Sequence, residues 1–543
     1  MRFRDALRFA ALAVLIVLET SCGQYYRPVV IPINTTQPNP ANFHAVFAVN
    51  SNGSFNPNPP VTNPSPTFSF DVGSAMQIDV SGDTIIGATG GLSAPEGHLN
   101  INPTHAAILP NGFRVFVASA GSVENNGVDV ISAFTPAGQS AIATGFGSLT
   151  TFSLPNIGTN PNTGAPSFCR YLPDFVTAAQ NTAVFVANFG VDGDPNCDLP
   201  STDSIAVLNP FSDTITNIVS LPAGSHPVAL AQAVNTNTNK IYSANQGNST
   251  ISSFNTVDMS PNPVTGFSGT TPVWMLTRAD GQKLYVLTQG DGSLVTINTV
   301  DDTAVGSVSV GPGANYMSYD PNLGRLYVTN PANSTLFIFS TSGGPNDTPA
   351  LLNSINLAPA AVSGNFPSCV NPCPVSVAAL PDGSRAYVAS YTLSSCSDPV
   401  FSATCVVTPQ VTVIDTASNT IKTAIPLMVA GSQPLTESID CVPTVPYTPA
   451  AVPIPVAGVN APRYAARFRL SAAAAADSSH VYIGVCDAGA VADIITTTST
   501  ISVSGNQPDT LVTDLPAPFG AGFPAPPANR PPFQNPIFLL PGR

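Results

Sequence analysis

The fold is decided by RLYVTN at Arg325–Asn330, which is followed after four residues by TLFIF at Thr335–Phe339. The same pair of segments occurs twice more, as KLYVLT at Lys283–Thr288 before SLVTI at Ser293–Ile297, and as KIYSAN at Lys240–Asn245 before TISSF at Thr250–Phe254. The first segments begin at residues 240, 283 and 325, so they are 43 and 42 residues apart. This period is typical of a four-stranded blade of a β-propeller, and the sequence therefore predicts an all-β fold.

Each repeat is interpreted as four strands, named a to d from the centre of the ring outward. Strand b recurs eight times, at His44–Asn50, Arg114–Ser119, Ala183–Asn188, Lys240–Asn245, Lys283–Thr288, Arg325–Asn330, Arg385–Ser390 and His480–Val485. Turn residues such as Pro381-Asp382-Gly383 stand between strands a and b, where the chain must reverse. We expect eight blades, or seven if the irregular last unit folds differently.

The two ends of the repeat region complement each other. The first unit has strands b, c (Met76–Val80) and d (Thr84–Ala88) but lacks strand a. Pro508–Val512 looks like a strand a with no strand b after it. We expect these fragments to form one composite blade, because a ring closed by both chain ends has no exposed sheet edge.

The repeats resemble the YVTN β-propeller repeat family, whose motif is reproduced by Tyr327-Val328-Thr329-Asn330. The resemblance covers roughly residues 43–516 and implies a propeller, but propellers have many unrelated functions. Residues 23–42 are interpreted as a polar tether and residues 517–543 as a Pro-rich tail that is extended or disordered.

Composition excludes some partners. Only 9% of the 543 residues are charged, the net charge is −14, and the lysines are Lys240, Lys283 and Lys422. Nucleic-acid binding needs a basic stripe, and none is present. The 55 prolines and 41 glycines agree with short strands joined by many turns.

The first 22 residues are typical of an export signal. Arg2, Arg4 and Arg8 precede the apolar run Phe9–Leu18, which makes about 15 Å of helix and is too short to span a bilayer. Leu18–Cys22 resembles a bacterial lipoprotein signal, in which Cys22 is lipidated, although Glu19 departs from the pattern. The alternative is a plain secretory signal. We expect a periplasmic or cell-surface protein that meets the membrane only through its lipid anchor.

Eight cysteines remain after Cys22, an even number that indicates disulfides in an exported chain. In a four-stranded blade the d-to-a and b-to-c connections emerge on the same face, and the cysteines lie in these connections. The expected pairs are Cys169–Cys197, Cys441–Cys486 and two bridges among Cys369, Cys373, Cys396 and Cys405. Within that last group, Cys369–Cys373 with Cys396–Cys405 is the local alternative.

Aligned openings of strand a give four candidate ligand-binding residues. His105, Arg170, Asn315 and Arg463 occupy a position that is proline in the other four units. His105, Arg170 and Arg463 fall on one arc, which could hold a carboxylate, phosphate or sugar acid. The alternative is that each arginine fixes its own loop through carbonyl groups.

Other chemistry is not indicated. The five histidines show no close pairing and the cysteines are committed to disulfides, so no metal site or cofactor is expected. Catalytic motifs such as Gly-x-Ser-x-Gly or a P-loop do not occur in a fitting context. Trp274 lies on an inner strand, where core packing is a more common role than stacking on a sugar.

The sequence favours a non-enzymatic binding or scaffold propeller that presents its disulfide-bearing loop face to a protein or polysaccharide. The alternative is a lactonase-like propeller hydrolase that opens a sugar lactone. Such chemistry needs a base and an oxyanion stabiliser, and His105 with Arg170 or Arg463 is the one plausible set.

Overall fold

The computed structural model separates residues 1–38 from a unit of residues 39–543, and the description below concerns the second unit. The structure describes residues 45–51, 73–88, 102–120, 130–136, 150–154, 157–159, 166–194, 197–235, 239–342, 348–357, 372–394, 396, 404–427, 435–444, 447–449, 452–456, 459–463, 466–497, 508–517 and 534–542. The predicted signal segment, its Cys22 and the polar tether lie outside these residues. No helix within the described part is long and apolar enough to cross a membrane.

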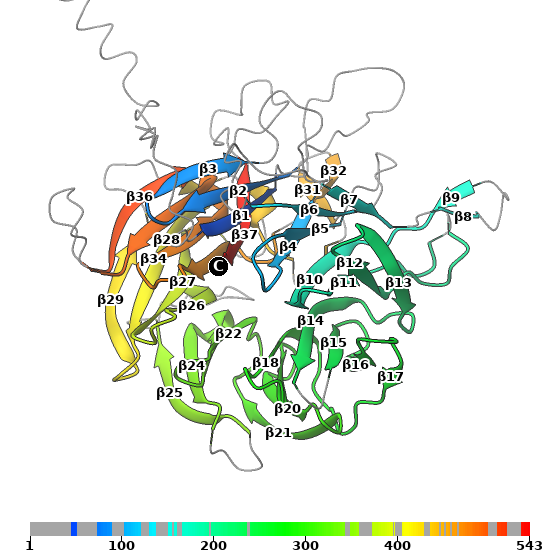
Figure 1. The fold of residues 1–543 in the computed structure, drawn as a ribbon. Coiled ribbons are helices and arrows are strands. Elements are labelled where there is room, and N and C mark those ends of the chain that lie inside the picture. The colour runs from blue at the N-terminus through cyan, green and yellow to red at the C-terminus, as the bar shows by residue number, and fades with distance from the viewer. Residues whose placement is uncertain are drawn as a thin grey trace, which may run out of the picture. The chain divides into compact units, whose positions relative to one another are not determined.

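Eight four-stranded antiparallel sheets form the ring of a β-propeller (Figure 1). From the inner to the outer strand, blade 1 has β37 (Asn535–Pro541), β1 (Ala45–Ser51), β2 (Ser74–Asp79) and β3 (Thr84–Ala88); blade 2 has β4 (Pro103–Ile108), β5 (Val115–Ser119), β6 (Val130–Phe134) and β7 (Thr150–Ser153); blade 3 has β10 (Pro173–Gln180), β11 (Ala183–Asn188), β12 (Ser204–Asn209) and β13 (Thr214–Ser220); and blade 4 has β14 (Pro227–Val234), β15 (Asn239–Asn245), β16 (Thr250–Asn255) and β17 (Pro261–Asn262).

The second half of the ring follows the same plan. Blade 5 has β18 (Pro272–Thr277), β19 (Lys283–Thr288), β20 (Ser293–Asn298) and β21 (Thr303–Ser309); blade 6 has β22 (Tyr316–Asp320), β23 (Arg325–Asn330), β24 (Thr335–Ser340) and β25 (Ala350–Asn356); blade 7 has β26 (Cys373–Ala379), β27 (Arg385–Ser394), β28 (Val406–Asp415) and β29 (Thr420–Pro426); and blade 8 has β33 (Leu470–Ala474), β34 (His480–Val485), β35 (Ala490–Ile495) and β36 (Thr510–Pro516). Eight blades, rather than seven, are therefore confirmed.

Short hairpins, a short strand and single 3₁₀ turns lie in the connections. They are the hairpins β8 (Ile157–Thr159) with β9 (Pro166–Phe168) and β31 (Val452–Val456) with β32 (Val459–Arg463), the short strand β30 (Leu435–Thr436) beside β28, and the single 3₁₀ turns η1 (Pro331–Asn333), η3 (Ile439–Cys441) and η4 (Cys486–Ala488).

The ring closes in a composite blade, as expected, but with a different C-terminal strand. Residues 510–516 pair with β35 as the outer strand of blade 8, so the prediction that Pro508–Val512 closes the ring is wrong. The closing strand is β37, which pairs with β1 and brings the two ends of the coloured chain into one blade (Figure 1). Its apolar centre, Ile537–Leu540, fits an inner strand, and the prolines at its ends are tolerated because this strand is the edge of its sheet. The propeller therefore extends to residue 541 instead of ending at 516.

Antiparallel pairing divides the connections between two faces of the ring. We call the face with the d-to-a and b-to-c connections the loop face, and the face with the a-to-b and c-to-d connections the turn face. The loop face carries the long segments 189–203 and 427–469, whereas most described turns on the opposite face span two to five residues.

The tyrosine of the repeated motif builds the core between blades. Tyr242, Tyr285, Tyr327, Tyr387 and Tyr482 are all fully buried on the second strand of their blades. A buried tyrosine needs a partner for its hydroxyl, and on the turn face several find an aspartate of the next blade. Tyr387 Oη, for example, donates to Asp509 Oδ1 at 2.5 Å.

A polar contact recurs beside these tyrosines, and we call it the blade latch. In four blades, a lysine or arginine at or next to the start of strand b binds an Asp or Asn in the c-to-d turn of the next blade. The latches are Arg114 with Asp213, Lys240 with Asp302 (2.6 Å), Arg325 with Asn419 (2.9 Å) and Arg385 with Asp509 (2.7 Å). Each acceptor has a positive φ of 54–61°, a conformation that Asp and Asn tolerate better than most residues.

Candidate functional site

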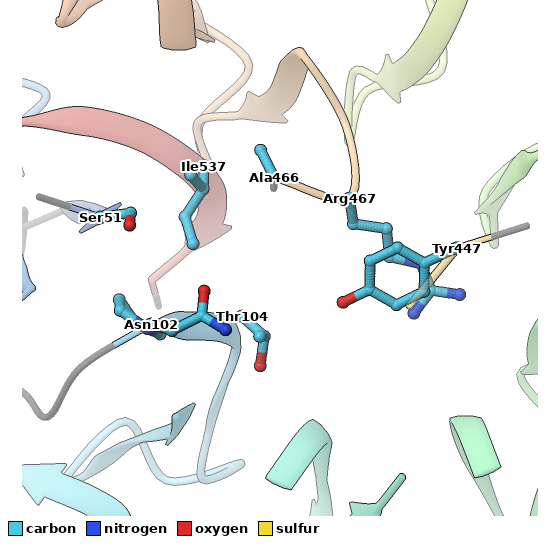
Figure 2. A pocket seen from close by; sticks show the side chains of 8 residues that line it. Ser51, Asn102, Thr104, Tyr447, Ala466, Arg467 and Ile537 are labelled. Atoms are coloured by element: carbon cyan, nitrogen blue, oxygen red, sulfur yellow. The ribbon is translucent and has the colours of Figure 1, made fainter. Parts of the chain in front are cut away.

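Side chains from the connection between blades 7 and 8 reach the inner strands of the ring. Tyr447, Ala466 and Arg467 of this connection lie next to Asn102 and Thr104 of blade 2 and line a common hollow (Figure 2). No part of this hollow is wide enough for a water molecule. It is therefore a packed seam between these elements.

Arg467 ties three blades together at this point. Its Nη1 donates to the carbonyl oxygen of Val228 at 2.6 Å, and its Nη2 donates to the carbonyl oxygen of Val273. Nη1 also lies 3.8 Å from Asp174 Oδ2. These three partners belong to β14, β18 and β10, the inner strands of blades 4, 5 and 3. One side chain thus bridges the inner strands of three consecutive blades.

Aromatic rings and a buried carboxylate complete the environment of Arg467. The guanidinium carbon lies 4.8 Å from the centre of the Tyr447 ring and 5.0 Å from that of Trp274, within the range of cation–π attraction. Tyr447 Oη donates to Asp174 Oδ1 at 2.5 Å. Burial raises the pKa of Asp174 to about 6, although Arg467 and Tyr447 oppose the shift. The same burial lowers the pKa of Arg467.

Trp274 is a packing residue, as the sequence suggested. Its ring centre lies 4.8 Å from that of Tyr316, 5.5 Å from that of Phe175 and 5.7 Å from that of Phe468. Edge-on and tilted contacts of this kind stabilise a core. The indole is 6% exposed, so no face of it is free to stack on a sugar.

Among the predicted ligand-binding residues, His105 lies within this central core. Its ring stacks on Phe175 with the ring centres 3.8 Å apart, and Phe538 of the closing strand lies 4.2 Å away. Burial and the charge of Arg467 place the pKa of His105 well below its usual value. The imidazole is therefore neutral and enclosed, which makes it a poor ligand for a soluble anion.

Arg170 and Asn315 have different roles. Thr202 donates its hydroxyl to the carbonyl oxygen of Arg170, while Nε and Nη2 of Arg170 are buried without a hydrogen-bond partner. Asn315 is satisfied within its own blade, because its side chain accepts from the Thr329 hydroxyl at 2.9 Å. Of these two residues, Arg170 retains unused donors.

The prediction for Arg463 rested on a wrong alignment. The inner strand of blade 8 begins at Leu470, seven residues later, and Arg463 is the last residue of the β31–β32 hairpin, where it pairs with Val452. Among the described contacts, none joins His105 to Arg170, and the third member of the predicted cationic arc, Arg463, has its side chain outside the described residues.

The residues that define the centre were not predicted from the sequence. Asp174 interrupts the apolar opening of β10, and Arg467 and Arg469 flank Phe468 in a chain with only 17 lysines and arginines. Charges in such apolar surroundings are a signal for buried ion pairs, because an unpaired charge is costly inside a protein. Arg469 fits this expectation, since it is 0% exposed and pairs with Glu437 at 2.5 Å and with Asp487 at 3.4 Å.

Disulfides fix the long connections of the loop face. Cys169–Cys197 and Cys441–Cys486 are formed as predicted. Cys396–Cys405 matches the local alternative for the third group. Cys373 is also disulfide-bonded, and Cys369 lies outside the described residues. Such bridges are typical of exported proteins.

A polar cluster of the loop face lies near the first of these disulfides. His226 Nδ1 is 3.3 Å from Asp203 Oδ1, and its Nε2 is 3.5 Å from Asp192 Oδ2. The ring also stacks on Phe189, with the centres 4.6 Å apart. The contact with Asp203 raises the pKa of His226 to about 9, so the imidazole is a charged partner of two carboxylates at neutral pH. It is poorly suited to act as a general base.

Solved structures with a similar chain path are other β-propeller-like proteins. They include the periplasmic gluconolactonase of Pseudomonas aeruginosa, with 11% identity over 92% of this chain and 99% of that chain and a TM-score of 0.43. A putative 6-phosphogluconolactonase from Bacteroides uniformis has 14% identity over 70% of this chain and 94% of that one, with a TM-score of 0.41. The hydrazine synthase of Kuenenia stuttgartiensis has 16% identity over 62% and 83%, with a TM-score of 0.40. Similarity at this level supports no inference about activity.

No protein-family model matches the chain, and no curated protein matches it. The resemblance to the YVTN repeat family therefore stays a prediction. What the fold and the site define is an eight-bladed β-propeller with inner strands bridged by Arg467 and a disulfide-bonded loop face.

Proposed function

We propose that this chain is an exported, non-enzymatic propeller, lipid-anchored at Cys22, that uses its loop face to bind a protein or carbohydrate partner. The observation that supports this function best is the bridging of three inner strands by Arg467. The guanidinium is bonded to blades 3, 4 and 5, and the hollow beside it is too narrow for water. A propeller that acts on a small metabolite needs a concave pocket with room for it.

The chemistry of the centre also argues against catalysis. A general base must reach the proton that it removes and must have a pKa near the working pH. His105 is buried between Phe175 and Phe538, and burial keeps its pKa well below its usual value. Arg467 is engaged with carbonyl groups, so it is not free to stabilise an oxyanion.

The loop face has the properties of a binding surface. Its long connections are held by disulfides, which lowers the entropy that they would lose on gripping a partner. Arg170 follows Cys169 directly and is half-buried, and its Nε and Nη2 are buried without hydrogen-bond partners. A carboxylate from a sugar acid or an acidic side chain is the natural partner for such a group.

The experiment is a binding screen of the full chain against an array of neutral and acidic glycans and against purified cell-envelope proteins. Binding to one class that is weakened at least about tenfold by Arg170→Ala supports the proposal, since a charge-assisted hydrogen bond contributes about 1.5–3 kcal/mol. Arg278→Ala is the matched control, because Arg278 lies on the turn face and pairs with Asp280 beside it.

The lactonase-like alternative is tested with the same preparation. The expected result is no hydrolysis of sugar lactones above the uncatalysed rate. Turnover that disappears in His105→Gln while the protein stays folded would contradict the proposal and establish the enzyme hypothesis.

A further inference from the structure

The seam between blade 8 and blade 1 has a latch that differs from those defined above. At the position of the lysine or arginine stands His480, whose Nε2 lies 3.4 Å from Asp83 Oδ1 in the c-to-d turn of blade 1. Asp83 also has a positive φ (48°), like the acceptors of the other latches. Tyr482 keeps the role of the motif tyrosine and donates its hydroxyl to Asp83 Oδ1 at 3.3 Å.

A buried carboxylate faces this histidine latch. Asp493 on β35 lies opposite Tyr482 in the sheet, where other blades have Ser253, Thr296, Ile338 or Val413. Asp493 is 0% exposed, and among the described residues no N–H or hydroxyl group donates to its carboxylate, whose polar neighbour is the carboxyl group of Asp83. Two adjacent buried carboxyl groups are costly unless a proton or a cation offsets their charge.

The hydrogen bonds around His480 fix which of its nitrogens is available. Ser479 has a single hydroxyl proton and donates it to Asp477 Oδ1 at 2.6 Å. The same Ser479 oxygen lies 2.8 Å from His480 Nδ1, so it accepts a proton from that nitrogen. Nε2 of a neutral His480 is then the lone-pair nitrogen, and it faces Asp83. A second hydrogen bond that orients the ring in this way is typical of metal-binding histidines.

The distances fit a small divalent cation. One ligand atom from each of Asp83, His480 and Asp493 lies within 4.8 Å of the others. A tetrahedral site with bonds of about 2.0–2.1 Å has ligand atoms about 3.3 Å apart, close to the 3.4 Å between His480 and Asp83. Among the described residues, no lysine or arginine pairs with Asp83 or Asp493.

We propose that Asp83, His480 and Asp493 bind one divalent transition-metal ion of the Zn²⁺ type, which joins blade 8 to blade 1. One imidazole nitrogen and two carboxylate oxygens suit Zn²⁺, and a fourth position is left for water or a second carboxylate oxygen. The ion replaces the lysine or arginine charge of the other latches at the seam where the ring closes. The sequence predicted no metal site because Asp83 lies about 400 residues before the other two ligands.

The test is a titration of the full chain with ZnCl₂ after removal of metals with EDTA, followed by calorimetry and thermal unfolding. We expect one Zn²⁺ per chain and a rise in Tm, because a ligand that binds only the folded state stabilises it. His480→Arg restores the latch residue of the other blades and removes a ligand. Asp493→Asn keeps the shape of the side chain. Each variant should fold and should bind Zn²⁺ at least about tenfold more weakly.

Two further variants test whether Zn²⁺ binds at this seam. His226→Gln changes a second cluster of one histidine and two aspartates, and Zn²⁺ binding should survive it. Ser479→Ala removes the group that orients His480 and should weaken binding about tenfold. The proposal is overturned if the wild-type chain binds no Zn²⁺ at micromolar concentration, if binding survives either ligand variant, or if it is lost in His226→Gln.

Discussion

The two faces of the ring are built on different principles. The turn face repeats one device, in which a cation and a tyrosine of one blade reach an Asp or Asn in the next. The described part of the loop face shows no such repeat: it carries an ion triad around Arg469, the disulfides and the Arg467 closure. The regular turn face therefore joins neighbouring blades by one repeated contact. The irregular loop face is not constrained to repeat, so its residues can differ from blade to blade.

The largest loss in the free energy of unfolding should come from a substitution of Arg469 on the loop face. Arg469→Leu leaves Glu437 and Asp487 buried without their counter-charge, which should cost about 3–5 kcal/mol of the free energy of unfolding. Urea denaturation measures this loss. Arg278→Leu is the control, because its pair with Asp280 is partly exposed and should cost less than about 1 kcal/mol. Equal losses in the two variants would remove the contrast between the faces.

Disulfide removal should have the next largest effect. Cys169 and Cys197 are 28 residues apart, and closing a loop of that length stabilises the folded state by about 3 kcal/mol. The double variant Cys169→Ala/Cys197→Ala should unfold at a correspondingly lower urea concentration. It should also lose protection from proteolysis within residues 189–203 first. An unchanged midpoint would mean that the loop is held by its packing alone.

A single blade latch on the turn face should contribute less to the free energy of unfolding than the ion pairs of Arg469 or the Cys169–Cys197 disulfide. Lys240→Met removes the bond from Nζ to Asp302 but leaves the Tyr242 hydroxyl in place. We expect a loss of about 2 kcal/mol, the usual contribution of a hydrogen bond to a charged group. Lys422→Met is a suitable comparison, because Asp509 keeps its second cation, Arg385. If Lys422→Met lowers the free energy of unfolding as much as Lys240→Met does, the latch residue is not the main contact of its aspartate.

The smallest effect is a pH dependence on the loop face. The pKa of His226 is about 9 in the folded chain and 6.5 as a reference value. The group binds its proton more tightly when folded, so its stabilisation is complete below pH 6.5 and is lost as the pH rises through 9. Tm measured from about pH 6 to about pH 10 should fall more steeply in the wild type than in His226→Gln. Parallel curves would show that His226 does not contribute.

The sequence predicted the repeated parts well for a physical reason. Tyr and the β-branched residues of Arg325–Asn330 recur with the blade period, and the structure has a strand with the same bounds. Cys169–Cys197 and Cys441–Cys486 followed from their places in connections of the same face. The closing strand was missed because prolines at 536 and 541 hide a short apolar run within a Pro-rich segment.

The candidate site was predicted less well. Arg463 was chosen by counting from the expected strand, but the hairpin β31–β32 shifts the true start of β33 to Leu470. His105 was placed on an open rim, whereas its ring is buried between Phe175 and Phe538. Insertions of this kind do not repeat with the blade period. The position of the next inner strand therefore cannot be found by counting residues from the preceding blade.

By itself, the sequence determined the four-stranded blade, because its pattern is local and repeats. It also determined the pairs Cys169–Cys197 and Cys441–Cys486, because each cysteine has a fixed place within its repeat. Only the tertiary structure decided which C-terminal strand closes the ring, which arginine enters its centre and which carboxylate meets His480. Those outcomes depend on segments hundreds of residues apart that compete for the same buried space. Asp493 and Asp83 become neighbours only when blade 8 meets blade 1.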